Sequence, residues 1–562
     1  MDKIVITISS QINRKIPTIF IPILISRLTK KTTLKNEICN YLPFLPKYDE
    51  ILHHIEDNIK HNELSGASVT IELPTHNNSI TGNFRTTSKK NLSRNKNIIT
   101  KTTTKTKTKK LTDGHSQLYQ LYIVVIKDNN TKNINELLEN ARKTGNNIFN
   151  AMKVNRIEKI NLIDTVCESS YITALLEGLL LSTYQFLKYK TAPDSSEKFT
   201  PSQVHIISST CKTINNSQIK VKQNILNNLK IEVESVFLAR DLVNEPANNA
   251  KSHLFIKTIK DYIKKWEIPI KVEVLDKKDL EKKGFGLILG VGAGSNEENA
   301  PRIVIMKYNG RKGGEHDKPD TVLLGKGITF DTGGLDLKSY RNMSEMKTDL
   351  AGAATVMAFL LGYARIGGAK KIYTICPFAE NSIGPNSVKP SDVLKAFNGK
   401  TVEITDTDAE GRLVLADCLS YANTLYPNAA LIDFATLTGQ QEAISCKMFS
   451  NVLGSNSGDD IAKMIKDGDR INEQLIEMPL MESKYLDKLD SSVADLKNVS
   501  TNCSADLILS AVFMRQFIKN TTKWIHIDIA GASWNNKDNV KYMSGEASGI
   551  GVRLLFEFFE CC

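Results

Sequence analysis

The chain has 562 residues, of which 41% are hydrophobic and 24% are charged. This length exceeds the size at which one hydrophobic core keeps growing, so we expect two domains, and the composition is that of an ordinary soluble globular protein. The net charge of +11 at pH 7 suggests a comparison with nucleic-acid-binding proteins, but the location of the excess charge matters more than its size.

Cysteine usage and hydropathy argue against a secreted or membrane protein. The nine cysteines include no C-x-x-C pair, which disfavours a disulfide framework and favours a reducing compartment. The first residues lack the long apolar region and cleavage site of a secretory signal. The apolar run at 17–25 is too short to span a bilayer and is predicted to be a buried strand. We therefore expect a cytoplasmic protein without a membrane partner.

Residues 1–229 are predicted to form a smaller amino-terminal α/β domain. The segments 3–9, 117–127 and 203–208 have strand patterns, and 169–187 has a helical one. A basic insertion at about 85–112 interrupts this domain.

The basic insertion contains nearly all of the excess charge. Between Arg85 and Lys110 there are ten Lys or Arg residues and no Asp or Glu. This Thr/Lys/Asn-rich stretch has too few apolar residues to offset the entropy of ordering, so we expect it to be disordered. We favour a tolerated loop over a nucleic-acid contact, which stays the alternative.

Residues 230–562 are predicted to form a larger catalytic domain with a mainly parallel sheet flanked by helices. The helical pattern at 231–248 ends at Asn-Glu-Pro, and 345–365 is a second helix candidate. Strand candidates alternate with helices and occur at 268–276, 286–292, 302–308, 321–327, 371–378, 430–439 and 523–531. Such alternation is typical of a parallel sheet covered on both faces, and ligands bind at the carboxyl ends of its strands.

Three loops at predicted strand ends contain clustered charge. The loop at 325–340 has five glycines, which allow tight turns and a close backbone approach to a ligand. In the second, 343–354, Asp349 precedes a run of small residues and is expected to be buried. The third, DTDAEGRL at 406–413, follows a strand pattern and precedes a helix.

Four acids in these loops predict a metal centre: Asp331, Asp349, Asp408 and Glu410. Four carboxylates could not share a dry site without protonation or a counter-ion. Two divalent ions, roughly 3.5–4 Å apart as in two-metal hydrolytic sites, would neutralise them. Zinc, manganese and magnesium all accept carboxylate oxygen as a ligand. The sequence has no H-E-x-x-H motif, so the commoner histidine-based zinc site is excluded. If the loop is extended, Asp408 and Glu410 point to the same side.

The same loops contain three basic residues that would lie near the predicted metal centre: Lys326, Lys338 and Arg412. Burial and nearby dications would lower the pKa of Lys326, and a neutral amine can ligate a metal. Lys338 and Arg412 would stay charged and could stabilise an oxyanion. Salt bridges to nearby acids are the alternative for both lysines.

These motifs resemble the cytosolic leucine aminopeptidase family. The matching segments follow the family's order over about residues 235–555, and the acidic octapeptide is the most specific of them: GKGITFDTGGLDLK, MKTDLAGAA, NGKTVEITDTDAEGRL, ATLTG and WIHIDIAG. The resemblance implies a metal-dependent exopeptidase that removes amino-terminal residues, often leucine and other apolar residues, from peptides. Family members are usually hexamers.

The resemblance also implies residue roles. Lys326, Asp331, Asp349 and Glu410 would bind one metal, and Asp331, Asp408 and Glu410 the other. Lys338 would polarise the scissile carbonyl. Arg412 would hold a bicarbonate that acts as general base. The Leu437 backbone carbonyl would accept a hydrogen bond from the substrate. The pocket for the first side chain would be shaped by Met346, Thr436, Gly439 and Ala530.

Three positions depart from the family pattern. Asp406 stands where the family usually has asparagine and adds a negative charge beside the metals. Leu350 and Tyr340 replace a frequent methionine and a frequent proline, and we expect packing changes there. None of these departures removes a predicted ligand.

Two other classes of function remain as alternatives. One is a nucleic-acid-binding or scaffolding protein on the same fold that uses the basic segment 85–110. The other, a metal-dependent phosphatase, is disfavoured because no phosphate-cradling loop follows a strand with suitable spacing.

Overall fold

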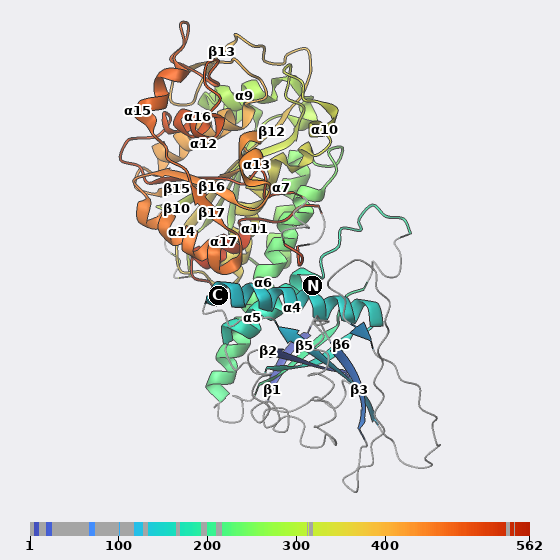
Figure 1. Ribbon diagram of the computed structural model, residues 1–562. Coiled ribbons are helices and arrows are strands. Elements are labelled where there is room, and N and C mark those ends of the chain that lie inside the picture. Colours follow the sequence, from blue (N-terminus) through green and yellow to red (C-terminus); the bar gives the residue numbers. More distant parts are fainter. Residues whose placement is uncertain are drawn as a thin grey trace. The chain divides into compact units, whose positions relative to one another are not determined.

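The computed structural model describes residues 5–9, 18–24, 67–73, 100–101, 117–126, 133–164, 169–192, 199–208, 216–311, 313, 318–534, 540–543 and 546–561. The chain divides into two compact units, Met1–Lys230 with Lys541–Met543 and Ile231–Val540 with Ser544–Cys562 (Figure 1). The predicted basic insertion lies outside the described residues, apart from Thr100–Lys101. Within the described part of the chain, no helix combines the length and apolar character needed to cross a bilayer.

The first unit contains a seven-stranded sheet in the order β1-β7-β6-β2-β5-β3-β4. Its strands are β1 (Val5–Ser9), β2 (Thr18–Leu24), β3 (Ala67–Leu73), β4 (Thr100–Lys101), β5 (Gln117–Ile126), β6 (Lys159–Asp164) and β7 (Gln203–Ser208). Strands β6 and β7 form a parallel pair, and β5 and β6 both run parallel to β2, which lies between them. These parallel arrangements require crossovers, which α4 (Ile134–Asn155) supplies between β5 and β6 and α5 (Ser169–Leu181) supplies between β6 and β7. These helices pack closely, since a Cβ at Gly145 would lie 2.0 Å from the Leu175 carbonyl oxygen.

The second unit is built on a nine-stranded sheet in the order β17-β16-β19-β15-β10-β12-β9-β8, with β11 paired to β12. The strands are β8 (Lys271–Leu275), β9 (Arg302–Tyr308), β10 (Thr321–Gly325), β11 (Gly327–Asp331), β12 (Ile372–Asn381), β15 (Ala430–Ala435), β16 (Ser450–Ser455), β17 (Leu475–Glu477) and β19 (Trp524–Asp528). The central strands β19, β15, β10 and β12 are parallel, which confirms the predicted mainly parallel sheet. A small sheet joins β13 (Val393–Lys395), β14 (Thr401–Glu403) and β18 (Leu496–Lys497).

The helices follow the alternation expected from the sequence. Those of the second unit, with the boundary helix α6, are α6 (Asn216–Asn244), α7 (Ser252–Lys265), α8 (Lys277–Lys283), α9 (Gly286–Val291), α10 (Tyr340–Met343), α11 (Ala351–Arg365), α12 (Glu410–Leu425), α13 (Gly439–Ser445), α14 (Gly458–Ile471), α15 (Glu482–Tyr485), α16 (Asp506–Arg515) and α17 (Val552–Phe558). Short 3-10 helices are η2 (Gly292–Gly294), η3 (Glu297–Asn299), η4 (Met346–Leu350) and η5 (Leu486–Leu489).

Helices cover both faces of the large sheet. Val322 and Leu324 of β10 belong to a buried cluster with α9, α12 and α16. Leu323 lies between them, so its side chain points to the other face, where α11 contacts β10. The sheet is therefore buried on both sides, and only its strand ends are left to build a site.

One predicted strand, 286–292, is wrong: residues 286–291 form helix α9. The buried positions Leu287, Ile288 and Val291 have helical spacing, and the backbone N–H groups of Leu287 and Ile288 donate to Asp417 Oδ2 at 3.0 and 3.1 Å. A buried carboxylate from α12 therefore satisfies the first turn of this short helix.

Candidate functional site

The predicted acids gather where β10 and β11 end. Lys326 separates the two strands, and Asp331 is the last residue of β11. The N–H of Lys326 donates to the Phe434 carbonyl at 3.0 Å, and the Lys326 carbonyl accepts from Ala353 N–H at 2.8 Å. These bonds join β15 and α11 to the break between the strands, so the Lys326 backbone is fixed from both sides.

Two glycines allow helices α11 and α12 to approach the break between β10 and β11 closely. A Cβ at Gly352, in the second position of α11, would lie 2.0 Å from the Phe434 carbonyl oxygen. A Cβ at Gly411, in α12, would lie 2.6 Å from Lys326 Nζ. Glycine at these positions lets the helices approach the strand end and leaves room for the lysine side chain.

Lys326 is buried between two of the predicted ligands. Its Nζ lies 2.8 Å from Asp349 Oδ1 and 2.8 Å from Glu410 Oε1, and it donates to the Thr436 carbonyl at 2.9 Å. Burial alone lowers the pKa of Lys326, but the charges of Asp349, Glu410 and Asp331 raise it above its usual value. The predicted lowering assumed two dications beside the amine, whereas carboxylates around it have the opposite effect.

Lys338 makes the second pair of contacts. Its Nζ lies 2.8 Å from Asp331 Oδ2 and 2.5 Å from Asp408 Oδ1. Burial opposes charge on this lysine too, yet the carboxylates raise its pKa above the usual range. Both lysines thus form the salt bridges considered as the alternative from the sequence, and the two pairs lie at one site.

Three of the acids form a group with the geometry of a cation site. Oxygen atoms of Asp331, Asp408 and Glu410 all lie within 4.8 Å of one another. Asp349 Oδ2 and Glu410 Oε2 are buried and have no hydrogen-bond partner among the described residues. Buried carboxylate oxygens normally have a partner, so these two atoms fit a metal-ligand role. The donor set is all oxygen apart from Lys326, which suits zinc, manganese or magnesium.

The pKa values of the acids show how crowded the site is. Burial raises the pKa of Asp331, and the negative charge of Glu410 raises it further. Burial and neighbouring carboxylates raise the pKa of Asp408 to about 7. Glu410 differs because Lys326 and Lys338 outweigh its burial and lower its pKa. The group therefore resists holding all its charges unless positive charge is close by.

The loop with Asp408 and Glu410 is not extended as expected. Asp408 lies in a turn, and Glu410 is the first residue of α12. The two carboxylates meet because the chain enters the helix there. Asp406, the position that departs from the family, accepts from Asp408 N–H through Oδ1 at 2.8 Å, and burial raises its pKa. Asp406 thus holds the turn that presents Asp408.

Four residues that were not predicted as site residues support the ligands or the loops beside them: Asn381, Asp336, Thr407 and Asp528. Asn381 Nδ2 donates to Asp331 Oδ1 at 2.8 Å, and Asp336 Oδ2 accepts from Thr407 N–H at 2.7 Å. Asp528 Oδ1 accepts from Leu437 N–H at 3.1 Å. Asn381 and Asp528 end strands β12 and β19, and this position at strand ends was the available signal.

A cavity of about 550 Å³ opens beside the acids. Its walls include Lys338, Asp408 and Arg412, and also the predicted substrate residues Leu437 and Gly439. Thr436 contacts one of the acids, since its Oγ1 donates to Asp349 Oδ1 at 2.9 Å. Met346, Thr436 and Ala530 do not line this cavity.

Arg412 is buried in the cavity wall and already has two partners. Its Nη1 donates to the Asn498 carbonyl at 2.9 Å, and its Nη2 lies 2.7 Å from Asp506 Oδ1. Asp506, which was not predicted, begins α16 and lines the same cavity.

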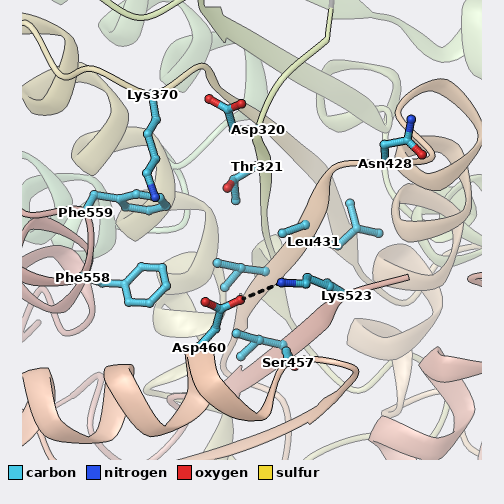
Figure 2. Close-up of a pocket in the computed structure, with 13 residues that line it drawn as sticks. Asp320, Thr321, Lys370, Asn428, Leu431, Ser457, Asp460, Lys523, Phe558 and Phe559 are labelled. Atoms are coloured by element: carbon cyan, nitrogen blue, oxygen red, sulfur yellow. Dashed lines mark ion pairs between the residues drawn. The ribbon is translucent and has the colours of Figure 1, made fainter. Parts of the chain in front are cut away.

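A second cavity, of about 520 Å³, lies at the amino ends of the central strands (Figure 2). Lys523 and Asp460 face each other there at 3.9 Å, and Lys370 Nζ lies 5.5 Å from the centre of the Phe559 ring. None of the predicted site residues lines it. The chemistry-bearing residues are thus gathered at the carboxyl ends of the strands.

Comparisons with known proteins identify the family to which the chain is similar. Residues 237–556 match the catalytic domain of the cytosol aminopeptidase family. A probable cytosol aminopeptidase of Wolbachia pipientis wMel is 38% identical over 391 residues, covering 68% of this chain and 73% of the relative. One of Protochlamydia amoebophila (strain UWE25) is 37% identical over 396 residues, covering 70% and 75%.

A solved structure is similar as well. The bottromycin maturation enzyme BotP, in complex with Mn, superposes with a TM-score of 0.68 at 25% sequence identity. The match covers 78% of this chain and 90% of that one.

Proposed function

Because this chain belongs to the cytosol aminopeptidase family, we propose that it removes leucine and other apolar residues from the amino termini of peptides with two bound metal ions. The chain is a metal-dependent hydrolase of the leucyl aminopeptidase type. The observation that carries the two-metal proposal is the group of Asp331, Asp408 and Glu410 oxygens within 4.8 Å, beside Asp349 and two lysines.

We propose the metal ligands that the family resemblance implies, and the contacts of the two lysines with the acids support them. Lys326, Asp331, Asp349 and Glu410 would hold one ion, and Asp331, Asp408 and Glu410 the other. Zinc or manganese is the proposed metal, with magnesium a third choice, and the complex of BotP with Mn supports manganese. When bound, the ions would act as Lewis acids toward water and the scissile carbonyl.

The chain's own residues then do three things. Lys338, in the cavity wall, would donate to the carbonyl oxygen as that atom gains negative charge. The Leu437 carbonyl would accept from a substrate N–H, while Asp528 fixes this loop through the Leu437 N–H. Met346, Thr436, Gly439 and Ala530 are proposed to shape the side-chain pocket. An apolar pocket discriminates by only about 1–3 kcal/mol per methylene, so a broad apolar preference is expected.

Three further assignments complete the proposal. We propose a homohexamer and a cytoplasmic location, both from the family resemblance. For Arg412 the resemblance implies a bound bicarbonate as proton acceptor, and the guanidinium lies at the cavity wall where such an anion would act.

Hydrolysis of leucyl-p-nitroanilide by the protein loaded with manganese or zinc tests the function. We expect turnover with metal and none with N-acetyl-leucyl-p-nitroanilide, since the free α-amine positions the substrate. Absence of turnover, together with salt-sensitive DNA binding that is lost on deleting residues 85–110, would instead favour the nucleic-acid alternative.

A further inference from the structure

We propose that the cavity at the amino ends of the central strands binds a free α-amino acid as its zwitterion (Figure 2). The inference goes beyond the proposed function, which enters only in the choice of leucine, the product of that reaction, as the occupant. None of the proposed metal ligands or substrate residues lines this cavity. It would therefore be a second ligand site of the catalytic unit.

The length of the strands separates the cavity from the metal-ligand group. Thr321 lines the cavity and begins β10, whereas Lys326 follows the other end of this strand. A strand of five residues spans about 17 Å, so an occupant of the cavity would not reach the acids. Ala430 of β15 and Ile525 of β19 line the same end of the sheet. Substitutions at the metal-ligand group should therefore leave the cavity intact.

The cavity presents charges of both signs at two places (Figure 2). Asp320 and Lys370 come from segments that are joined by hydrogen bonds, and Asp460 and Lys523 face each other at 3.9 Å. A molecule with one positive and one negative group can find an opposite charge at each place. A dianion or a dication would meet a like charge at both places, and this disfavours phosphate compounds and diamines.

Both lysines are available to a carboxylate. Among the described residues, no carboxylate forms an ion pair with Lys370, whose Nζ lies 5.5 Å from the centre of the Phe559 ring. Lys523 Nζ is too far from Asp460 Oδ2, at 3.9 Å, for a hydrogen bond, and its side chain is 63% exposed. A carboxylate can therefore approach either ammonium group without breaking a tight internal pair.

The two aspartates can accept from an ammonium group. Asp320 Oδ2 accepts from the N–H of Lys371 at 2.9 Å, which fixes this carboxylate and leaves Oδ1 for a ligand. Asp460 lies in the first turn of α14, and its side chain is 39% exposed. Hydrogen bonds between charged groups are the strong ones, so these contacts would contribute most of the selectivity.

The remaining lining is mostly apolar and suits the side chain of the amino acid. Leu431, Ile432 and Ile525 belong to the strand ends, and Phe558 and Phe559 end the last helix. The volume of about 520 Å³ lies within the range of small-molecule pockets, about 300–1,000 Å³. Apolar walls with a few charged groups are typical of such pockets, whereas an inorganic ion would leave the apolar walls unused.

The test measures leucine binding to the full-length Glu410→Gln variant by titration calorimetry. This variant is expected to lack turnover, so it can be titrated without hydrolysis of an analogue. We expect saturable binding of leucine at millimolar concentrations. Lys370→Gln and Asp460→Asn, each introduced into this variant, should weaken binding by about tenfold or more, because each removes a charged partner of the ligand.

Two analogues of leucine test the zwitterion. Leucinamide lacks the carboxylate, and 4-methylpentanoate lacks the ammonium group. Each should bind to the Glu410→Gln variant at least about tenfold more weakly than leucine, for the same reason.

The neighbouring residues provide matched controls. Lys371→Gln and Asp459→Asn remove the same kinds of charge one position away, and neither residue lines the cavity. Both should bind leucine as tightly as the Glu410→Gln parent. In the metal-loaded wild type, Lys370→Gln and Asp460→Asn should leave the turnover of leucyl-p-nitroanilide unchanged, which also checks that they fold.

Three results would overturn the proposal: no saturable binding of leucine, binding that Lys370→Gln and Asp460→Asn do not weaken, or an analogue that binds as tightly as leucine. Failure of the proposed function is distinct, since the metal-loaded wild type would then show no turnover whatever the cavity binds.

Discussion

Glu410 is, with Asp331, one of the two residues shared by the two proposed metal-ligand sets. It is 2% exposed, its Oε1 contacts Lys326 at 2.8 Å, and its Oε2 has no hydrogen-bond partner among the described residues. Glu410→Gln keeps the shape and removes the charge. We expect kcat to fall by at least about a hundredfold, as when a key electrostatic contact is lost. Activity and metal content per subunit are the measurements, and the oligomeric state should not change.

Glu273→Gln provides the control for this substitution. Glu273 pairs with Lys307 at the edge of the sheet and is 42% exposed, so its loss should leave turnover unchanged. Near-normal turnover of Glu410→Gln with two metals bound would show that Glu410 is not a bridging ligand.

Candidate metal-ligand acids can be predicted from the sequence when they lie at the ends of predicted strands. Asp331 and Asp349 could be predicted because acids that follow strands or precede small-residue runs stand out in one short window. Asp506 could not, because its partner Arg412 lies 94 positions away and only the contact between helices α12 and α16 brings them together. The direction in which the pKa of Lys326 shifts depends on which charges surround the amine. The sequence alone does not show which charged groups will lie beside it in the fold.

Helix α12 joins the site to the rest of the unit through one buried carboxylate. Asp417 accepts from the N–H groups of Leu287, Ile288 and Phe397 at 2.8–3.1 Å, and burial raises its pKa to about 7. Asp417→Asn would turn an amide NH₂ toward these donors. We expect unfolding to become easier by about 1–3 kcal/mol, the cost of an unsatisfied buried group.

Thermal or urea unfolding measures this effect, and Asp487→Asn is the control. Asp487 is 61% exposed, so its pair with Lys488 should contribute little to stability. Equal stability of the two variants would mean that Asp417 does not hold α9 in place.

The Asp417 carboxylate also explains why the predicted strand at 286–292 was wrong. A short apolar run with glycines is compatible with strand or helix by periodicity alone. Its helical form is settled by Asp417, about 130 positions further along the chain. Longer elements such as α11 and β12 were predicted because their hydrophobic patterns extend over ten or more residues. A single long-range contact does not change the secondary structure of so long a segment.

The second unit as a whole should be stabilised by its metals. A ligand that binds only the folded state raises the free energy of unfolding by RT ln(1 + [L]/Kd). Chelation with EDTA should therefore lower the melting temperature of the wild type and change that of Glu410→Gln much less. Differential scanning fluorimetry with and without added manganese measures both shifts. Equal melting curves for the wild type with and without metal would contradict a metal centre built into the fold.

The order of the strands has a consequence for biosynthesis. Strand β10 lies between β12 and β15, so the break that presents Lys326 is complete only after residues up to Ala435 have joined the sheet. A growing chain that has passed Glu410 contains all five predicted ligands and still lacks the strand that holds them together. Metal uptake would then have to wait until β15 has been synthesised and paired, so the protease would stay inactive at least until that point in its synthesis.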